Sequence, residues 1–414
     1  MAAIVLGLIL LSLTIWLGLL SFWGQFWRAD QQLEVETLDT TSLESLPVVC
    51  AIMPARNEAD LIATTLRSLL LQDYPGSLNV FLVDDRSTDR TANFAEGVAY
   101  ALNKPQQLHI ISGESLPPGW SGKLWAIEQG IQKVETVDVT SLQKPDYFLL
   151  TDADIEHDVG NLRRLVAKAV QEDLDLVSVM VRLRCEGFWE KLLIPAFVFF
   201  FQKLYPFRWV NSPNNPTAAA AGGCILIRRE ALEQIGGIQA IRQTLIDDCA
   251  LARAVKERGR QNNSSSPAPG RIWLGLSTLT HSLRPYPTLG TIWDMVARTA
   301  YTQLDYSPLL LLGTLLGMTL IYLVAPVGVI LGLIWGNWAM SDDKTHCVYA
   351  FTGLLTWLLM TLAYLPTIRF YKCPLWLAFC LPAIAFLYTL MTLDSALRHW
   401  QGRGGAWKGR VYPR

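Results

Sequence analysis

The sequence has few charged residues and no excess of basic ones. Only 17% of its 414 residues are charged, and the formal net charge is −1. Proteins that bind nucleic acid neutralise phosphates with clusters of Lys and Arg, so this balance argues against a nucleic-acid partner. The hydrophobic fraction, 51%, is high for a soluble protein. The composition therefore indicates that the chain contains membrane segments.

Several common site motifs are also missing. The seven cysteines form no C-x-x-C pair and have no regular spacing, which excludes a zinc ribbon and argues against a disulfide framework. We expect them to be small apolar side chains in a reducing compartment. The first predicted strand is followed by neither G-x-G-x-x-G nor G-x-x-x-x-G-K-[ST]. Dinucleotide-binding and P-loop folds are therefore poor interpretations.

Long apolar runs lie toward the two ends of the chain. Residues 2–23 are uncharged and long enough to cross a bilayer, which takes about 20 residues. Because neither a basic n-region nor an A-x-A site flanks this run, we expect an uncleaved N-terminal transmembrane anchor at 1–27. Further apolar runs at 308–338, 348–366 and 374–393 predict a C-terminal transmembrane region at 305–395, before a basic tail at 396–414.

The basic residues near these runs predict the orientation, with one conflict. Arg28 follows the first run and places the middle of the chain in the cytoplasm, on a bacterial inner membrane. The tail carries Arg398, Arg403, Lys408, Arg410 and Arg414 and should also be cytoplasmic. Three spans after a cytoplasmic domain would, however, leave the tail outside. Either 308–338 is a hairpin broken near Pro326 or the tail is exceptional, and the sequence leaves both open.

Between the apolar ends, predicted strands alternate with predicted helices. This pattern is typical of an α/β fold with a mostly parallel sheet and helices on both faces. The predicted strands are residues 48–53, 79–83, 108–111, 147–150 and 175–181. Residues 188–209 interrupt the pattern with a short apolar core flanked by Trp, Tyr, Lys and Arg. We expect this segment to lie at the membrane interface, although an ordinary core helix is the alternative.

Acidic residues follow two of these strands. Asp152 and Asp154 end the strand 147–150, and Asp84 and Asp85 end the strand 79–83. Ligands of open α/β sheets bind outside the carboxyl ends of the strands. Paired carboxylates at D-x-D spacing suit Mg²⁺ or Mn²⁺ bound to phosphates, although this short motif alone is weak and also fits a surface turn. Asp84 and Asp85 could receive hydroxyl and N–H donors of a ribose or a base.

A second acidic pair, Asp247 and Asp248, begins a predicted helix. The helix dipole favours negative charge at that end, which is a sufficient structural explanation. The functional alternative is a general base that deprotonates an acceptor hydroxyl in the same crevice.

Five motifs in order resemble the inverting family-two glycosyltransferases with a Rossmann-like GT-A fold, over about residues 47–300. They are PARNE, VDDRSTD, TDAD, GGCILIRREAL and IDDCALA. The stretches PPGWSGKLWA, ARTAYTQLDYSPLLLL and TLDSALRHWQGRGGAWKGRVYP resemble the hopene-associated glycosyltransferases. That subgroup is related more loosely to ceramide glucosyltransferases and carotenoid glycosyltransferases.

The resemblance implies a cytoplasmic domain that moves a sugar from a nucleotide-sugar, expected to be a UDP-sugar, to a lipid hydroxyl, expected to be of hopanoid type. Carotenoid, sphingolipid and polyisoprenyl-phosphate acceptors are the alternatives, and a catalytically silent membrane scaffold is a further one. The implied roles are a nucleotide pocket at Pro54, Arg56 and Glu58, uridine or ribose contacts at Asp84 and Asp85, a divalent metal at Asp152 and Asp154, diphosphate neutralisation at Lys123, and a base at Asp248 supported by Asp247.

One family motif is only partly present. Membrane synthases of the family carry Q-x-x-R-W near the second membrane entry, whereas this chain reads Met295-Val296-Ala297-Arg298-Thr299. The resemblance leaves Arg298 as a possible diphosphate clamp. In processive relatives the Trp stacks on the growing polymer, so its loss favours a single transfer over polymerisation.

Overall fold

The computed structural model describes residues 2–34, 46–136, 143–261, 270–338, 345–403, 406–407 and 410–411. Part of the predicted basic tail, 396–414, therefore lies outside the described residues. The chain divides into two compact units. The helical unit comprises Met1–Asp30, Cys185–Pro206 and Tyr286–Ala406, and the sheet unit comprises Gln31–Arg184, Phe207–Pro285 and Trp407–Arg414.

The sheet unit is built on an eight-stranded sheet with the order β3-β2-β1-β4-β7-β6-β8-β5. Its strands are β1 (Val49–Ala55), β2 (Leu78–Asp84), β3 (Leu108–Ser112), β4 (Tyr147–Thr151), β5 (Ile155–Glu156), β6 (Leu176–Arg182), β7 (Cys224–Arg228) and β8 (Ile272–Ser282). The first four strands of this order are parallel, whereas β7 runs antiparallel to both neighbours. The predicted α/β fold is confirmed, with a mixed sheet.

The antiparallel strand has a physical reason in the chain path. Parallel neighbours need a crossover that returns the chain to the same edge of the sheet. Between β6 and β7 the chain instead passes through the helical unit at Cys185–Pro206. The strand β7 then enters the sheet in the opposite direction, a change of direction that the residues of β7 do not encode.

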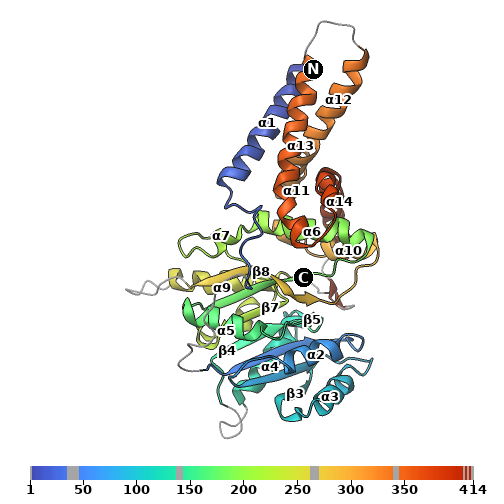
Figure 1. Cartoon of the computed structure of the whole chain (residues 1–414). Coiled ribbons are helices and arrows are strands. Elements are labelled where there is room, and N and C mark those ends of the chain that lie inside the picture. Colours follow the sequence, from blue (N-terminus) through green and yellow to red (C-terminus); the bar gives the residue numbers. More distant parts are fainter. Residues whose placement is uncertain are drawn as a thin grey trace. The chain divides into compact units, whose positions relative to one another are not determined.

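Helices cover the sheet of this unit (Figure 1). They are α2 (Ile62–Leu70), α3 (Thr91–Ala101), α4 (Gly122–Thr136), α5 (Asn161–Gln171), α8 (Arg229–Gln234) and α9 (Asp247–Gln261). In α2 the buried Ile62, Leu66 and Leu69 recur at helical spacing and form one apolar face. At Gly130 of α4 a Cβ atom would lie 2.6 Å from Ile52 of β1, so this glycine lets the helix pack closely on the strand.

The helical unit contains α1 (Ala2–Phe22), α6 (Phe188–Leu204), α10 (Leu289–Ala297), α11 (Pro308–Met318), α12 (Val324–Trp338), α13 (Thr345–Phe370), η5 (Leu375–Cys380) and α14 (Leu381–Trp400). By length and composition, four stretches of the described residues could cross a membrane: Ala3–Phe22, Pro308–Ile334, Cys347–Phe370 and Leu375–Trp400. α1, α12 and α13 pack against one another, as Figure 1 shows.

The hairpin near Pro326 that the sequence left open does not form. α11 continues through the π-helical turn η4 (Thr319–Leu323) into α12. Inside an α-helix, proline lacks the N–H for one backbone bond and clashes with the carbonyl four residues earlier, here that of Tyr322. The π turn includes Tyr322 and changes the local bonding there, which lets the helix pass the proline without breaking.

The predicted interfacial segment, 188–209, forms α6 and the short helix α7 (Phe207–Val210). α6 packs against α10, α13 and α14, and the Tyr388 hydroxyl of α14 donates to the Leu193 carbonyl at 2.9 Å. Residues 185–206 and 286–406 belong to the helical unit, although the predicted catalytic domain spans 47–300. Whether α6 lies at a membrane interface stays a prediction.

Candidate active site

The carboxyl ends of β1, β2 and β4 lie at the same edge of the sheet because these strands are parallel and adjacent. The predicted nucleotide residues follow β1 and β2. The Arg56 guanidinium donates to the Asp85 carbonyl at 2.7 Å and lies 3.6 Å from the Asp85 carboxylate. Asp84 accepts a hydrogen bond from the Ser87 N–H at 3.1 Å. The structure thus brings Arg56 and Asp85 together at the edge where a nucleotide is expected.

The two carboxylates of the D-x-D motif face different partners. Asp152 Oδ1 lies 2.8 Å from the Lys123 ammonium. Asp154 accepts a hydrogen bond from Arg284 Nε at 2.9 Å and one from the Ser282 hydroxyl at 3.3 Å. Each acidic residue of the motif is therefore paired with a different basic residue of the chain.

Arg284 was not singled out in the sequence. It follows β8, and its second nitrogen donates to Glu58 at 2.6 Å. It thus joins Asp154 to a residue predicted to line the nucleotide pocket. A single Arg after a strand belongs to no spacing pattern, and Glu58, Asp154 and Arg284 come together only when β1, β4 and β8 share one sheet.

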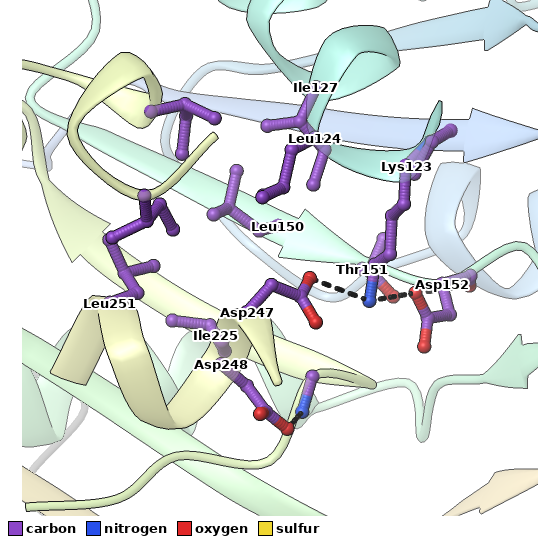
Figure 2. A pocket seen from close by; sticks show the side chains of 14 residues that line it. Lys123, Leu124, Ile127, Leu150, Thr151, Asp152, Ile225, Asp247, Asp248 and Leu251 are labelled. Carbon is purple, nitrogen blue, oxygen red and sulfur yellow. Dashed lines mark hydrogen bonds and ion pairs between the residues drawn. The ribbon is translucent and has the colours of Figure 1, made fainter. Parts of the chain in front are cut away.

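Lys123 lies at the centre of an acidic cluster formed with Asp152, Asp247 and Asp248. Its ammonium lies 2.8 Å from Asp152 Oδ1 and 3.3 Å from Asp247 Oδ2, and Figure 2 shows the side chain between these two carboxylates. Burial alone would lower the pKa of Lys123, but the neighbouring carboxylates outweigh it and raise the pKa. Lys123 is therefore a fixed positive charge.

Two backbone N–H groups hold the Asp248 carboxylate. Gly222 N–H donates to its Oδ2 at 2.9 Å, and Cys249 N–H donates to its Oδ1 at 2.8 Å. Burial, followed by the charge of Asp247, raises the pKa of Asp248 to about 6, against the opposing effects of Lys123 and the two N–H groups. Such a carboxylate is ionised at neutral pH yet accepts a proton more readily than an ordinary Asp.

Gly222 fits closely between these groups. A Cβ atom at this position would lie 3.1 Å from Lys123 Nζ and 3.4 Å from Asp248 Oδ2. Any side chain at position 222 would crowd Lys123 and Asp248, and the Gly222 N–H could then not approach the Asp248 carboxylate as closely. The glycine therefore serves a close backbone approach.

A buried hydrogen-bond chain behind the D-x-D motif was also missed by the sequence interpretation. Asn161 Nδ2 and His157 Nδ1 are 3.0 Å apart, His157 Nε2 and Thr151 Oγ1 are 2.9 Å apart, and Thr151 donates to the Gly223 carbonyl at 3.0 Å. Since the amide nitrogen can only donate, Nδ1 accepts and Nε2 carries the proton. Burial lowers the pKa of His157 to about 4, so the imidazole is neutral. The chain links the end of β4 to the glycine pair beside Asp248.

The acidic cluster borders a small, mostly apolar cavity. Its lining includes Pro54, together with Leu124, Ile127, Leu150 and Leu251, which Figure 2 labels. The volume is about 20 Å³, which is room for about one water. A nucleotide-sugar does not fit inside it, so the cavity itself is not the binding site of such a ligand.

The acidic cluster fits a divalent cation in its chemistry. Asp152 and Asp247 both approach one positive charge, and carboxylate oxygens are the ligands that Mg²⁺ and Mn²⁺ prefer. Among the described residues, no group of three His, Cys, Asp or Glu side chains is already arranged to hold a metal. The metal roles of Asp152 and Asp154 therefore stay predictions. Arg298 lies in the helical unit, is exposed and directly follows α10, and its role as a clamp also stays a prediction.

Comparison with known proteins shows what part of the sheet unit is similar to. Residues 50–236 match the model of the family described as "Glycosyl transferase family 2". The chain therefore resembles this family over somewhat less than half of its length. It also resembles the solved mannosyltransferase PcManGT from Pyrobaculum calidifontis, with a TM-score of 0.54 and 16% identity over 95% of this chain and 99% of that one. That likeness supports the GT-A fold.

Curated relatives of the family 2 domain match part of the chain. A beta-monoglucosyldiacylglycerol synthase from Nostoc sp. is 26% identical over 212 residues, which are 50% of this chain and 41% of the relative. An N-acetylglucosaminyltransferase from Rhizobium leguminosarum bv. trifolii is 40% identical over 80 residues, 19% of this chain and 44% of the relative. The chain thus spans less than half the length of these relatives.

Proposed function

We propose that the protein is a membrane-bound inverting glycosyltransferase that moves a sugar from a nucleotide-sugar to a hydroxyl of a lipid. The observation that carries the proposal is the arrangement around Lys123. A carboxylate with a pKa near neutrality, Asp248, lies beside a lysine that is paired with the first carboxylate of the D-x-D motif. The arrangement puts a base and a positive charge side by side, in a sheet unit whose residues 50–236 match the family 2 model.

The residues divide the chemistry between them. Asp248 takes the proton from the acceptor hydroxyl, and the oxygen attacks the anomeric carbon from the face opposite the diphosphate. The new C–O bond forms as the bond to the diphosphate oxygen breaks, which inverts the configuration. Lys123 stabilises the negative charge that develops on the leaving diphosphate. A divalent cation held by Asp152 and Asp154, when bound, would balance further diphosphate charge.

The donor is proposed to lie along the strand ends. Arg56 and Asp85 are paired there, and Asp84 and Glu58 stand at the ends of the same two strands. Carboxylates at strand ends accept hydrogen bonds from ribose hydroxyls and base N–H groups. This favours the nucleoside on the β1 and β2 side and the diphosphate beside Lys123, with uridine as the proposed nucleoside.

The acceptor is proposed to be a hopanoid-type triterpenoid, on the motifs shared with hopene-associated glycosyltransferases. Diacylglycerol is the second candidate, favoured by the relatives named beta-monoglucosyldiacylglycerol synthase. Both are hydrophobic alcohols that reside in a bilayer. An acceptor of this kind would explain why a glycosyltransferase carries four stretches that are long enough to cross a bilayer.

Lipid analysis tests this proposal directly. Membranes from cells that produce the protein, and from cells that lack it, are incubated with radiolabelled UDP-glucose or GDP-mannose, and the labelled lipids are identified by mass spectrometry. We expect label in a lipid glycoside only where the protein is present. Label in a triterpenoid supports the first acceptor and label in diacylglycerol the second, whereas no labelled lipid with either donor would contradict the proposal.

A further inference from the structure

The last apolar stretch, Leu375–Trp400, begins and ends at the same end of the helical unit. Before it, Cys373 Sγ lies 3.5 Å from Cys185 Sγ, next to the start of α6. At its other end, the Ser395 hydroxyl donates to the Ala297 carbonyl of α10 at 2.5 Å. α6 and α10 pack against each other, so both ends of the stretch adjoin the same pair of helices.

Between these two ends the stretch turns back along α13. The Trp357 indole N–H donates to the Phe379 carbonyl of η5 at 2.9 Å. Trp357 lies 13 residues before the end of α13 at Phe370, roughly 20 Å along the helix. α14 then returns beside α11, where Ala396 packs in one cluster with Leu311. The stretch is therefore a hairpin with its apex near Phe379.

This path removes the conflict between the spans and the basic tail. A segment that enters and leaves on the same side leaves three crossings: α1, α11–α12 and α13. Arg369, Lys372 and Arg398 then all lie at the end of the unit where α6 and α10 pack. Basic residues flanking spans mark the cytoplasmic side, and the tail now agrees with that rule.

The apex of the hairpin lines an apolar groove. Its walls are Trp376, Phe379 and Phe386 of the hairpin, Trp357 of α13, and Val327 of α12, among other apolar residues. The groove holds about 700 Å³, within the range of ordinary ligand sites. Water in such a groove would find too few hydrogen-bond partners, so hydrocarbon is the occupant that the lining favours.

From these contacts we infer that Leu375–Trp400 is a re-entrant hairpin that does not cross the membrane, and that its apex groove holds the hydrocarbon part of the lipid acceptor. The second half of this inference rests on the proposed function, whereas the first does not. Flat indole and phenyl rings on two sides suit a rigid, polycyclic hydrocarbon as well as an acyl chain. The experiments below separate these parts.

Cysteine labelling tests the hairpin. Arg403→Cys and Asp342→Cys are made separately in the full chain carrying Cys347→Ser, and a membrane-impermeant maleimide is added to intact spheroplasts or to inverted vesicles. We expect Arg403→Cys to react only in inverted vesicles and Asp342→Cys only in spheroplasts. Reaction of both positions from the same side would show that the stretch crosses the membrane and would overturn the inference.

A matched pair of variants tests the groove. Val327→Trp fills it, whereas Val348→Trp places the same ring on α13 outside it; the two valines are 50% and 44% exposed. A diazirine-bearing triterpenoid alcohol and a diazirine-bearing diacylglycerol serve as probes, and crosslinked peptides are identified by mass spectrometry. We expect Val327→Trp to reduce crosslinking of residues 375–386 at least ~5-fold for the true acceptor, with Val348→Trp close to wild type.

The crosslinking of the two variants and the activity of the wild type distinguish failure of the groove from failure of the proposed function. Equal crosslinking in wild type and Val327→Trp would overturn the groove as the acceptor site. Equal loss in Val327→Trp and Val348→Trp would attribute the effect to general damage of the helical unit and would also overturn it. Failure of the wild type to glycosylate any lipid would instead contradict the proposed function and leave the hairpin test unaffected.

Discussion

At the scale of single residues, the account depends on Asp248 as the base. A proton-transfer residue contributes about 10²–10⁴-fold to a rate. We therefore expect Asp248→Asn to lower kcat by about that factor while the dissociation constant of the nucleotide-sugar, measured by calorimetry, changes little. A normal rate in Asp248→Asn would show that another group is the base.

The pH dependence of the rate follows from the environment of Asp248. The carboxylate must be ionised to accept a proton, so kcat/KM should fall as the pH drops below the Asp248 pKa of about 6. Asp247 raises that pKa through its charge. In Asp247→Asn we expect the acid limb of the pH profile to move to lower pH, and an unmoved limb would contradict the assignment.

Lys123 is expected to act on the donor. Charge-assisted hydrogen bonds contribute about 1.5–3 kcal/mol, so Lys123→Met should weaken nucleotide-sugar binding by about 10- to 100-fold. Since Lys123 also lowers the pKa of Asp248, the acid limb should move to higher pH. Lys133→Met, on an exposed position of the same helix, is the control and should leave both measurements unchanged.

At the scale of elements, the hydrogen-bond chain through His157 holds the end of β4. His157→Phe removes one hydrogen-bond partner of Thr151 and one of the Asn161 amide, and each lost hydrogen bond contributes about 0.5–1.5 kcal/mol. His157→Gln keeps a donor and an acceptor. We expect a lower apparent melting temperature in detergent for His157→Phe than for His157→Gln, and equal values would contradict the role of the chain.

The same element predicts a pH effect on stability. The pKa of His157 is about 4 in the folded protein and about 6.5 when unfolded, so the unfolded chain binds the proton first. Its contribution to stability is present above pH 6.5 and is lost as the pH falls from 6.5 toward 4. The melting temperature of wild type should fall more steeply than that of His157→Phe across this interval.

Strand ends were the part of the site that the sequence could predict. The buried strands β2 and β4 end directly before Asp85 and Asp152, and this pattern predicts a ligand-binding edge of the sheet. The parallel arrangement of β2, β1 and β4 follows from the alternation of strands with helices. The pairing of Arg284 with Asp154 and Glu58 was not predictable, since it depends on β8 joining the same sheet. The antiparallel direction of β7 was not predicted, because the direction of a strand depends on the connection that precedes it and not on the five residues of the strand.

In the helical unit, the long apolar runs allowed the helices to be predicted but not their path through a membrane. The long runs predicted helices that could span a membrane, and these helices are present. The length and composition of an apolar run do not determine whether it crosses the membrane or turns back within it. That distinction depends on long-range contacts, such as the Trp357 bond to Phe379.

At the scale of the whole molecule, the chain combines a sheet unit, whose residues 50–236 match the family 2 model, with a unit of apolar helices. The proposed soluble donor and bilayer-resident acceptor would require such a combination, because neither substrate is concentrated where the other resides. The proposal therefore predicts that a detergent-purified full chain needs both a nucleotide-sugar and a lipid alcohol for turnover.

The most direct test is the transfer of radiolabelled sugar to lipid by the purified full chain, with wild type and Asp248→Asn measured side by side under one set of donors and lipid extract. The account predicts labelled lipid with wild type, and with Asp248→Asn a loss of at least about 100-fold despite retained donor binding. Equal labelling by the two proteins, or donor binding without any labelled lipid in wild type, would contradict it.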